Sequence, residues 1–467
     1  MHRVVTEVQE VVADPVGLKK YALLAMAIFL YTLAVSTLIQ FVLLPKVFAA
    51  WHAGNGLLAG TDMPFYHQLA LDLAQDIDQH GWSVWTLRPG GQAPAGIAGA
   101  LYALVAPKPW TMIPLYALLH ALAGVLMARI LLFIDPRWTV AVIGALPLVL
   151  FPSAATWYSQ LGKDGFSIAG YLALVLGWLM LSRAHLKPRL SHISSGFLLI
   201  LGGAGLIWIV RPYAVEILIP LSGAAALVLA ILLIPNAAIG RLQWRWAAAA
   251  LAVSWVAVAT LVPLATGGFQ SEISSVTPVT PDAAEGQSRP DELAWLNSGW
   301  LPPALEDRIR SLAEARFGFT TSYPEAGSNV DNETNFRQVS DVVAYLPRAA
   351  TIAFLYPVPI QWFQEGTLPQ NTLMRRVAGL EMTAVYLALI MLPYAVWRWR
   401  GQLETWLLLL FSTGMILVHA LVFANLGTLY RLRYPYLMSL VGLSVAAVTA
   451  ALLDRRARVP NAEVEAT

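Results

Sequence analysis

The chain has 467 residues, of which 57% are hydrophobic and only 12% are charged. Because soluble globular domains carry about 25% charged residues, this composition excludes an ordinary soluble protein. The chain contains no cysteine, which excludes a disulfide bond, a thiolate nucleophile and a cysteine-bound metal. Its formal net charge of +2 is small and does not indicate a nucleic-acid partner.

Apolar segments of membrane length recur along the chain, and a helix needs about 20 such residues to cross the hydrocarbon core. We therefore expect an all-α polytopic membrane protein with about ten transmembrane helices and amphipathic helices in its outer loops. The segments are residues 21–46, 112–134, 138–156, 165–184, 194–210, 213–234, 246–266, 376–398, 403–425 and 434–453. Two weaker apolar stretches, 94–106 and 349–362, contain prolines, and we interpret them as re-entrant or interfacial pieces.

Basic residues predict the orientation, because Lys and Arg accumulate in short cytoplasmic loops. If the N-terminus is cytoplasmic, every even-numbered helix returns to a basic loop. These loops contain Arg137, Arg183, Lys187, Arg189, Arg241, Arg245, Arg398, Arg400, Arg455, Arg456 and Arg458. The pattern favours an even number of helices with both chain ends in the cytoplasm.

The same pattern divides the chain into parts. In order, these are a cytoplasmic N-terminal segment (1–18), a transmembrane module (19–266) with a first outer loop (47–111), a large outer loop (267–375), the C-terminal transmembrane helices (376–453) and a cytoplasmic tail (454–467). The large loop exceeds the usual length of loops without internal structure, and its leucine spacing predicts a helix over 291–317. The N-terminal segment is either a short interfacial helix or a loose tail.

The first outer loop contains the sequence GTDMPFYH at residues 60–67, which opens an amphipathic helix. Its acidic residue, Asp62, is a candidate catalytic base on the outer face of the membrane. The alternative is that Asp62 caps the helix, since an acidic residue before a proline is a common helix start. The two roles are compatible, because a capping carboxylate retains a free oxygen.

Four cations lie next to expected helix ends on the outer face, against the positive-inside trend: Lys163, Arg211, Arg431 and Arg433. An anion at the membrane surface, such as a lipid phosphate, would account for several of them together. The alternative is that each extends to lipid headgroups or pairs with a neighbour such as Asp164 or Glu216. Residues two apart cannot share one helix face, so at most one of the last two is expected in a common site.

Two other features have simpler explanations. The turn at Arg88 could return that side chain over the site, although a plain turn explains it as well. Asp331, Asn332 and Glu333 could bind a divalent cation, although a solvated acidic loop is the simpler explanation. The histidines have no zinc-ligand spacing, so we expect neither a metal nor a cofactor.

The layout of one helix, an acidic first outer loop, a bundle and a later large outer loop resembles the GT-C superfamily of polytopic glycosyltransferases. WYSQLGKD (157–164) and VRPY (210–213) also resemble bacterial membrane proteins of surface-polysaccharide assembly. The resemblance implies that Asp62 is the base and that Lys163, Arg211 and Arg431 or Arg433 bind the donor phosphate. Neighbouring residues expected at the substrates are Tyr66, His67, Arg88, Asp164 and Tyr213.

The expected function is thus an inverting glycosyltransferase of the bacterial inner membrane. It would transfer a hexosyl or pentosyl group from a polyprenyl-phosphate-linked donor to a lipid, glycan or protein acceptor on the periplasmic side. One alternative is an O-antigen-type polymerase or ligase that uses a polyprenyl-diphosphate glycan. Another is a lipid or solute transporter, against which the scarcity of charges within the apolar segments argues.

Overall fold

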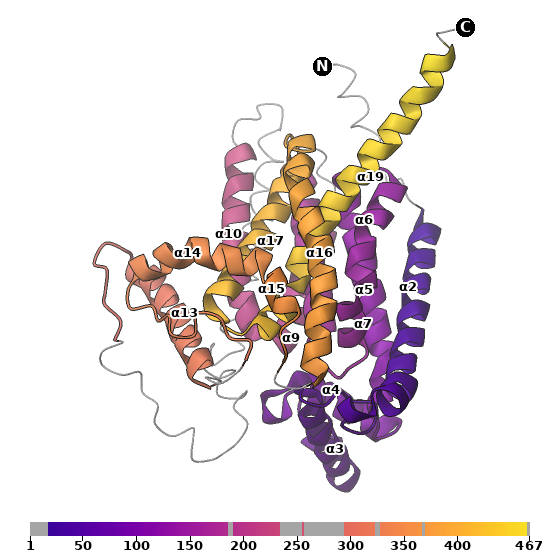
Figure 1. Ribbon diagram of the computed structural model, residues 1–467, viewed down its shortest axis with the longest axis vertical. Helices are drawn as coiled ribbons and strands as arrows, with labels where there is room; N and C mark the ends of the chain where they lie inside the picture. Colours follow the sequence, from indigo (N-terminus) through magenta and orange to yellow (C-terminus); the bar gives the residue numbers. More distant parts are fainter. Residues whose placement is uncertain are drawn as a thin grey trace.

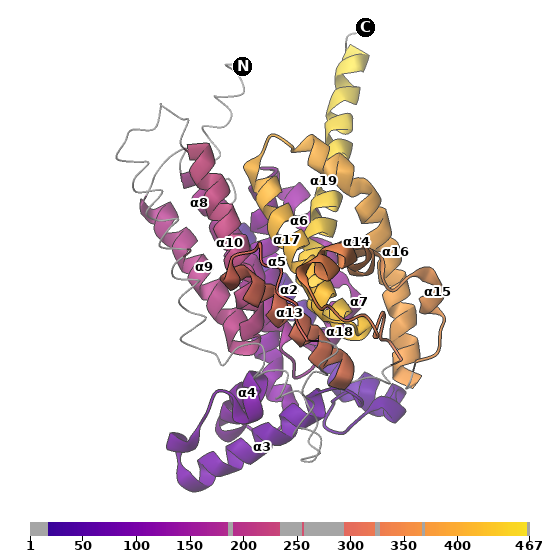
Figure 2. The ribbon, with the colours of Figure 1, turned by 90° about the vertical axis from the view of Figure 1, so that its left-hand side faces the viewer.

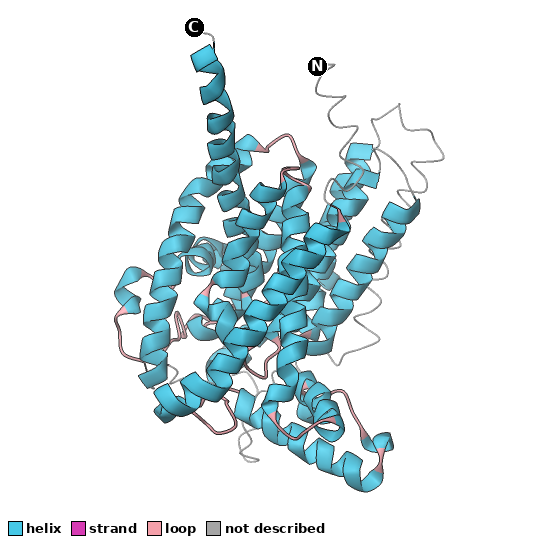
Figure 3. Cartoon of the chain, turned by 90° about the vertical axis from the view of Figure 1, so that its right-hand side faces the viewer, coloured by secondary structure: helices cyan, strands magenta, loops and turns pink. Residues whose placement is uncertain are grey.

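The computed structural model describes residues 17–184, 190–233, 255, 294–322, 327–366 and 369–464. Every regular element in these ranges is a helix (Figure 3). Among the described residues, eight helices are long and apolar enough to cross a membrane, and a bent pair would make a ninth. The chain is therefore an all-α polytopic membrane protein, as the sequence predicted.

The long apolar helices coincide with the expected segments. They are α2 (Leu18–Leu38) with its π-helical continuation η1 (Ile39–Val47), α5 (Ile113–Leu132), α8 (Asp164–Ala184), α9 (Leu190–Val210), α10 (Pro212–Leu233), α16 (Pro369–Arg398), α17 (Leu403–Val422) and α19 (Tyr434–Val464). The expected segment 246–266 lies outside the described residues apart from Trp255. Helix α16 begins earlier than predicted, which places several polar residues inside it.

The segment predicted as one helix over 138–156 is instead two helices, which together are long and apolar enough for one broken span. Helices α6 (Trp138–Leu150) and α7 (Pro152–Tyr158) meet at an angle of 64°. The residue before a proline avoids the helical conformation, and Phe151 is extended with a ψ of 136°. Helix α7 packs against α2 and α16.

Helices α8 and α9 pack with their backbones in close contact. A Cβ atom on Gly170 would lie 2.7 Å from the carbonyl oxygen of Gly203, and one on Gly203 would lie 2.4 Å from that of Gly170. Small residues permit this approach between helices in a membrane. The packing brings the start of α8 beside the end of α9, where Asp164 and Arg211 lie.

The bundle has two distinct ends (Figures 1 and 2). Helices α3 (Met63–His80) and α4 (Ala93–Leu104) lie at one end, and α19 projects from the other. We call these the α3 end and the α19 end. The expected apolar stretch 94–106 coincides with α4, which is too short to cross a membrane.

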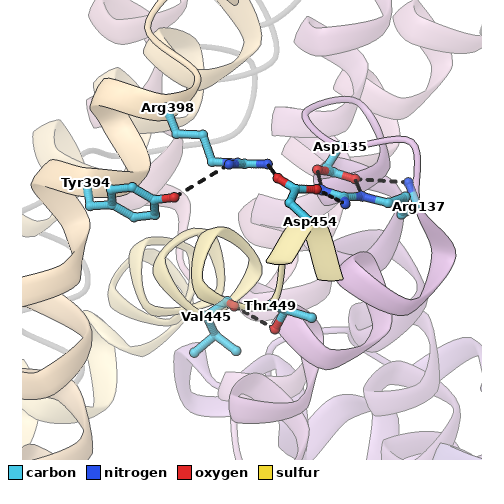
Figure 4. Close-up of polar contacts among 7 residues, drawn as sticks. All are labelled: Asp135, Arg137, Tyr394, Arg398, Val445, Thr449 and Asp454. Atoms are coloured by element: carbon cyan, nitrogen blue, oxygen red, sulfur yellow. Dashed lines mark hydrogen bonds and ion pairs between the residues drawn. The ribbon is translucent and has the colours of Figure 1, made fainter. Parts of the chain in front are cut away.

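An ionic network ties three elements together at the α19 end (Figure 4). Arg137 donates hydrogen bonds to Asp135 at 2.7 Å and to Asp454 at 2.6 Å. Arg398 donates to the second oxygen of Asp454 at 2.6 Å. The network joins the loop between α5 and α6 to α16 and α19.

The large outer loop contains α13 (Pro303–Ser322), α14 (Val339–Leu355) and α15 (Pro359–Trp362). The helix predicted over 291–317 starts only at Pro303, because the prolines at 302 and 303 disfavour helix before them. Helix α14 packs against α17. A short helix, α18 (Leu426–Leu432), then connects α17 to α19.

Candidate active site

Asp62 occupies the N-cap position of α3, but its side chain accepts no capping hydrogen bond. Its backbone is already helical, with φ of −72° and ψ of −14°, whereas a capping residue usually has an extended backbone. The side chain is 50% exposed. Asp62 therefore presents a solvent-accessible carboxylate at the α3 end that the helix itself does not use.

Arg431, on α18, lies between two carboxylates. One of its terminal nitrogens is 3.6 Å from Oδ2 of Asp62, and its Nε is 3.8 Å from Oδ1 of Asp164. Both distances exceed those of N–H···O hydrogen bonds. The guanidinium is thus attracted by both carboxylates and hydrogen-bonded to neither.

Asp164 and Arg211 form a buried ion pair between the start of α8 and the end of α9. The guanidinium of Arg211 donates to Oδ1 of Asp164 at 2.7 Å, and the two side chains are 6% and 2% exposed. The other carboxylate oxygen, Oδ2, is buried without a hydrogen-bond partner. Because an unsatisfied buried acceptor costs about 1–3 kcal/mol, this oxygen is a candidate acceptor for a ligand donor group.

These four residues form one chain of alternating charges: Asp62, Arg431, Asp164 and Arg211. We call it the site cluster. Tyr66, one turn into α3, is buried beside it. Burial raises the pKa of the Tyr66 phenol well above its usual range; the two carboxylates raise it further, and the two arginines lower it. Tyr66 therefore stays neutral and lies within electrostatic reach of the whole cluster.

His67 belongs to a different network, between α3 and α4. Its Nδ1 lies 2.8 Å from the hydroxyl of Tyr102, and its Nε2 lies 3.3 Å from the side-chain nitrogen of Asn55. Lys108 donates to the side-chain oxygen of Asn55 at 3.0 Å. Burial lowers the pKa of His67, and the positive charge of Lys108 lowers it further. The structure thus places His67 outside the site cluster.

Arg433 is also outside the cluster, although it was predicted to bind phosphate. It is buried and donates to the carbonyl oxygens of Ile352 at 3.2 Å and Ala353 at 2.6 Å, and to that of Tyr356. These are the carbonyls at the C-terminal end of α14, which carry a partial negative charge. Arg431 and Arg433 therefore point to different partners.

Three predicted residues remain: Arg88, Tyr213 and Lys163. Arg88 donates to the carbonyl of Trp208 on α9 and lies over its indole ring at 4.5 Å. The ring of Tyr213 lies 6.4 Å from that of His419 and 6.1 Å from that of Phe423. Lys163 is half-buried and directly precedes Asp164.

In the acidic loop considered as a cation site, Asp331 already forms an ion pair with Arg348. Arg348 donates to both oxygens of Asp331, at 2.8 and 3.0 Å, and the hydroxyl of Tyr345 donates at 2.8 Å. The hydrogen bonds from Arg348 lower the pKa of Asp331. In the part of the chain that the structure describes, no group of three or more His, Asp or Glu side chains could hold a metal ion.

The sequence argument missed a second polar group, centred on Glu381. Its carboxylate accepts from the backbone N–H and the hydroxyl of Ser153, both at 2.6 Å, and from the hydroxyl of Tyr430. The signal was present, because a charged residue inside an apolar segment is itself a functional candidate. The predicted helix start at 376 concealed it by placing Glu381 near a helix end.

Comparisons with known protein families, curated proteins and solved structures gave no match. The class of the protein is therefore defined by its own fold, that of a polytopic all-α membrane protein. Its α3 end carries the half-exposed carboxylate of Asp62 beside the guanidinium of Arg431. Chemically, this arrangement can accept a proton and stabilise a developing negative charge.

Proposed function

We propose that the protein is a membrane glycosyltransferase that uses a polyprenyl-phosphate-linked sugar as donor and a lipid, glycan or protein as acceptor. One observation carries the proposal. The carboxylate of Asp62 is half-exposed, makes no capping hydrogen bond to α3 and lies 3.6 Å from the guanidinium of Arg431. Glycosyl transfer needs a base for the acceptor hydroxyl and a cation for the departing phosphate. These two groups are adjacent at the α3 end of the bundle.

In the proposed reaction, Asp62 takes the proton of the acceptor hydroxyl as its oxygen attacks the anomeric carbon of the donor. The bond from that carbon to the phosphate oxygen breaks, and the phosphate leaves with the electron pair. Arg431 stabilises the negative charge that develops on the phosphate. A single displacement of this kind inverts the anomeric configuration.

Arg211 acts from inside the protein in this scheme. Its guanidinium is buried and bonded to Asp164, so it holds that carboxylate in place and adds positive potential beneath Arg431. The unbonded oxygen of Asp164 is buried, and in this scheme it accepts a hydrogen bond from a hydroxyl of the sugar or the acceptor. Lys163, next in the chain, adds a further positive charge for the phosphate.

The proposed location is a bacterial inner membrane with the site on the periplasmic side. Support comes from the basic residues at the α19 end of the bundle. Arg137 and Arg398 lie in the network at the α19 end, and Arg400 follows α16 there. Basic residues accumulate on the cytoplasmic side of membrane proteins, which favours an extracytoplasmic α3 end.

The test is native mass spectrometry of the purified protein, first for lipid that copurifies and then after adding undecaprenyl phosphate. We expect wild type to bind the lipid phosphate and Arg431→Gln to bind it at least roughly tenfold more weakly, as for loss of a charged hydrogen bond. Arg400→Gln is the matched control, because Arg400 is an exposed arginine that follows α16 at the α19 end of the bundle. A copurified diphosphate-linked glycan would instead indicate the polymerase or ligase. Equal binding by all three proteins would overturn the phosphate site.

A further inference from the structure

Glu381 is a buried carboxylate within the apolar helix α16, where it is 3% exposed. Placing a charged side chain in a membrane-spanning segment is costly, so such residues usually have a specific partner and a function. Here the partners are Ser153, at the start of α7, and Tyr430, on α18. A leucine would fill the same space without this cost, so the interaction with α7 and α18 is the feature to explain.

Tyr430 is held from two sides. Its hydroxyl donates to Glu381, and the guanidinium of Arg433 lies 5.2 Å from the centre of its ring. Arg433 is in turn fixed by the carbonyls at the end of α14. Tyr430 thereby connects α16, α14 and α18, and it directly precedes Arg431 in the chain.

Helix α18 needs such external support. It has seven residues, and helices of this length are not stable by themselves. Its first turn is capped by Asn425, which accepts from the N–H of Thr428 at 3.1 Å and donates to Ser328 at 2.8 Å. The cap fixes one end of α18, and Tyr430 fixes the other.

Arg431 has no short contact of its own to hold it in the site cluster, since its distances to Asp62 and Asp164 are 3.6 and 3.8 Å. Its location therefore depends on where α18 is placed. We infer that Glu381 is a positioning residue, which holds Tyr430 and thereby places Arg431 between the two carboxylates. The consequence for ligand binding rests on the proposed function, whereas the positioning itself does not.

The positioning can be measured without any ligand. Because the chain has no cysteine, the substitutions Gln68→Cys and Thr428→Cys place two spin labels uniquely on α3 and α18. We expect the label-to-label distance distribution to broaden or shift in Tyr430→Phe and in Glu381→Gln. Glu404→Gln is the matched control, since Glu404 is a buried glutamate that bonds to Arg183 at the α19 end. Unchanged distributions in both test variants, or equal broadening in the control, would overturn the inference.

The effect on the site is measured by undecaprenyl phosphate binding. We expect Tyr430→Phe to weaken binding roughly three- to tenfold, as for one hydrogen bond. In an Arg431→Gln background, Tyr430→Phe should have no further effect, because both changes act through the same group. Additive losses would indicate that Tyr430 merely stabilises the fold and would overturn the inference. If wild type binds no lipid phosphate but the distances change as expected, the positioning holds and the proposed function fails.

Discussion

The two ends of the bundle each carry a chain of two aspartates and two arginines, but the chains differ in how completely they are bonded. At the α19 end, all four carboxylate oxygens of Asp135 and Asp454 accept hydrogen bonds from arginines, at 2.6 to 2.8 Å. At the α3 end, Oδ1 of Asp164 alone accepts one from an arginine of the site cluster. Arg431 is more than 3.5 Å from both of its carboxylates.

This difference separates a structural clamp from a site with unused binding capacity. A fully bonded network stabilises one arrangement of helices and has little to offer to a ligand. The site cluster keeps a half-exposed carboxylate, an unbonded buried oxygen and a guanidinium between two acceptors. The comparison therefore supports placing the proposed ligand site at the α3 end.

The largest expected effect is on activity at the α3 end. Asp62→Asn keeps the shape of the side chain, but the amide cannot take the proton of the acceptor hydroxyl. We therefore expect glycosyl transfer to fall roughly 10²- to 10⁴-fold. The fold should be unaffected, because Asp62 makes no capping hydrogen bond. The measurement is transfer of labelled sugar from a polyprenyl-phosphate donor in detergent or vesicles.

Asp76→Asn is the control for this prediction, because Asp76 is an exposed aspartate on the same helix. It should retain the activity of the wild type. Full activity in Asp62→Asn would remove Asp62 as the base and leave the two ends of the bundle functionally alike.

The next effect is on stability. Arg211→Met leaves the buried carboxylate of Asp164 without its hydrogen-bonded cation, and breaking such a pair costs about 3–5 kcal/mol. The double variant Arg211→Met with Asp164→Leu should recover part of this loss, because no uncompensated charge remains. The free energy of unfolding in a denaturing detergent measures both. A double variant less stable than Arg211→Met would contradict the assignment of the cost to Asp164.

Removing an ion pair at the α19 end should lower the free energy of unfolding by less. Asp454 is 36% exposed, and exposed ion pairs contribute about 0.2–1 kcal/mol. We expect Asp454→Asn to lower the free energy of unfolding by that amount and to leave transfer activity unchanged. A loss of activity would mean that the clamp at the α19 end communicates with the site.

Much of the fold follows from local sequence patterns. Apolar segments of membrane length predicted the spans, and the polar stretch after Asp62 predicted α3. The two-residue spacing of Arg431 and Arg433 predicted that they would not share a face. These features depend on periodicity and charge along a single segment, which the sequence displays directly.

The site required contacts that no local pattern contains. Arg433 bonds to carbonyls of α14, about 80 residues earlier in the chain. Glu381 was not recognised as buried, because the polar first turns of α16 hid the true helix start at Pro369. His67 follows Tyr66 directly, yet the 100° turn per helical residue directs it to α4 instead of the site cluster.

The smallest expected effect is on the attachment of α3 to α4 through the His67 network. The direct partners of His67, Tyr102 and Asn55, are uncharged. Burial lowers the pKa of His67 in the folded protein, so the unfolded chain binds a proton first as the pH falls. The stabilisation is therefore fully present above the ordinary histidine pKa of about 6.5 and is lost progressively below it. A cysteine introduced at the fully buried Ala70 reports this through the ratio of its labelling rates in the His67 and His67→Gln proteins. The ratio should rise below that pH and cancels the ordinary slowing of thiol labelling as the thiolate is protonated. Equal pH dependence in both proteins would show that protonation of His67 does not weaken the attachment of α3 to α4, and that the support of the site cluster does not respond to pH through this residue.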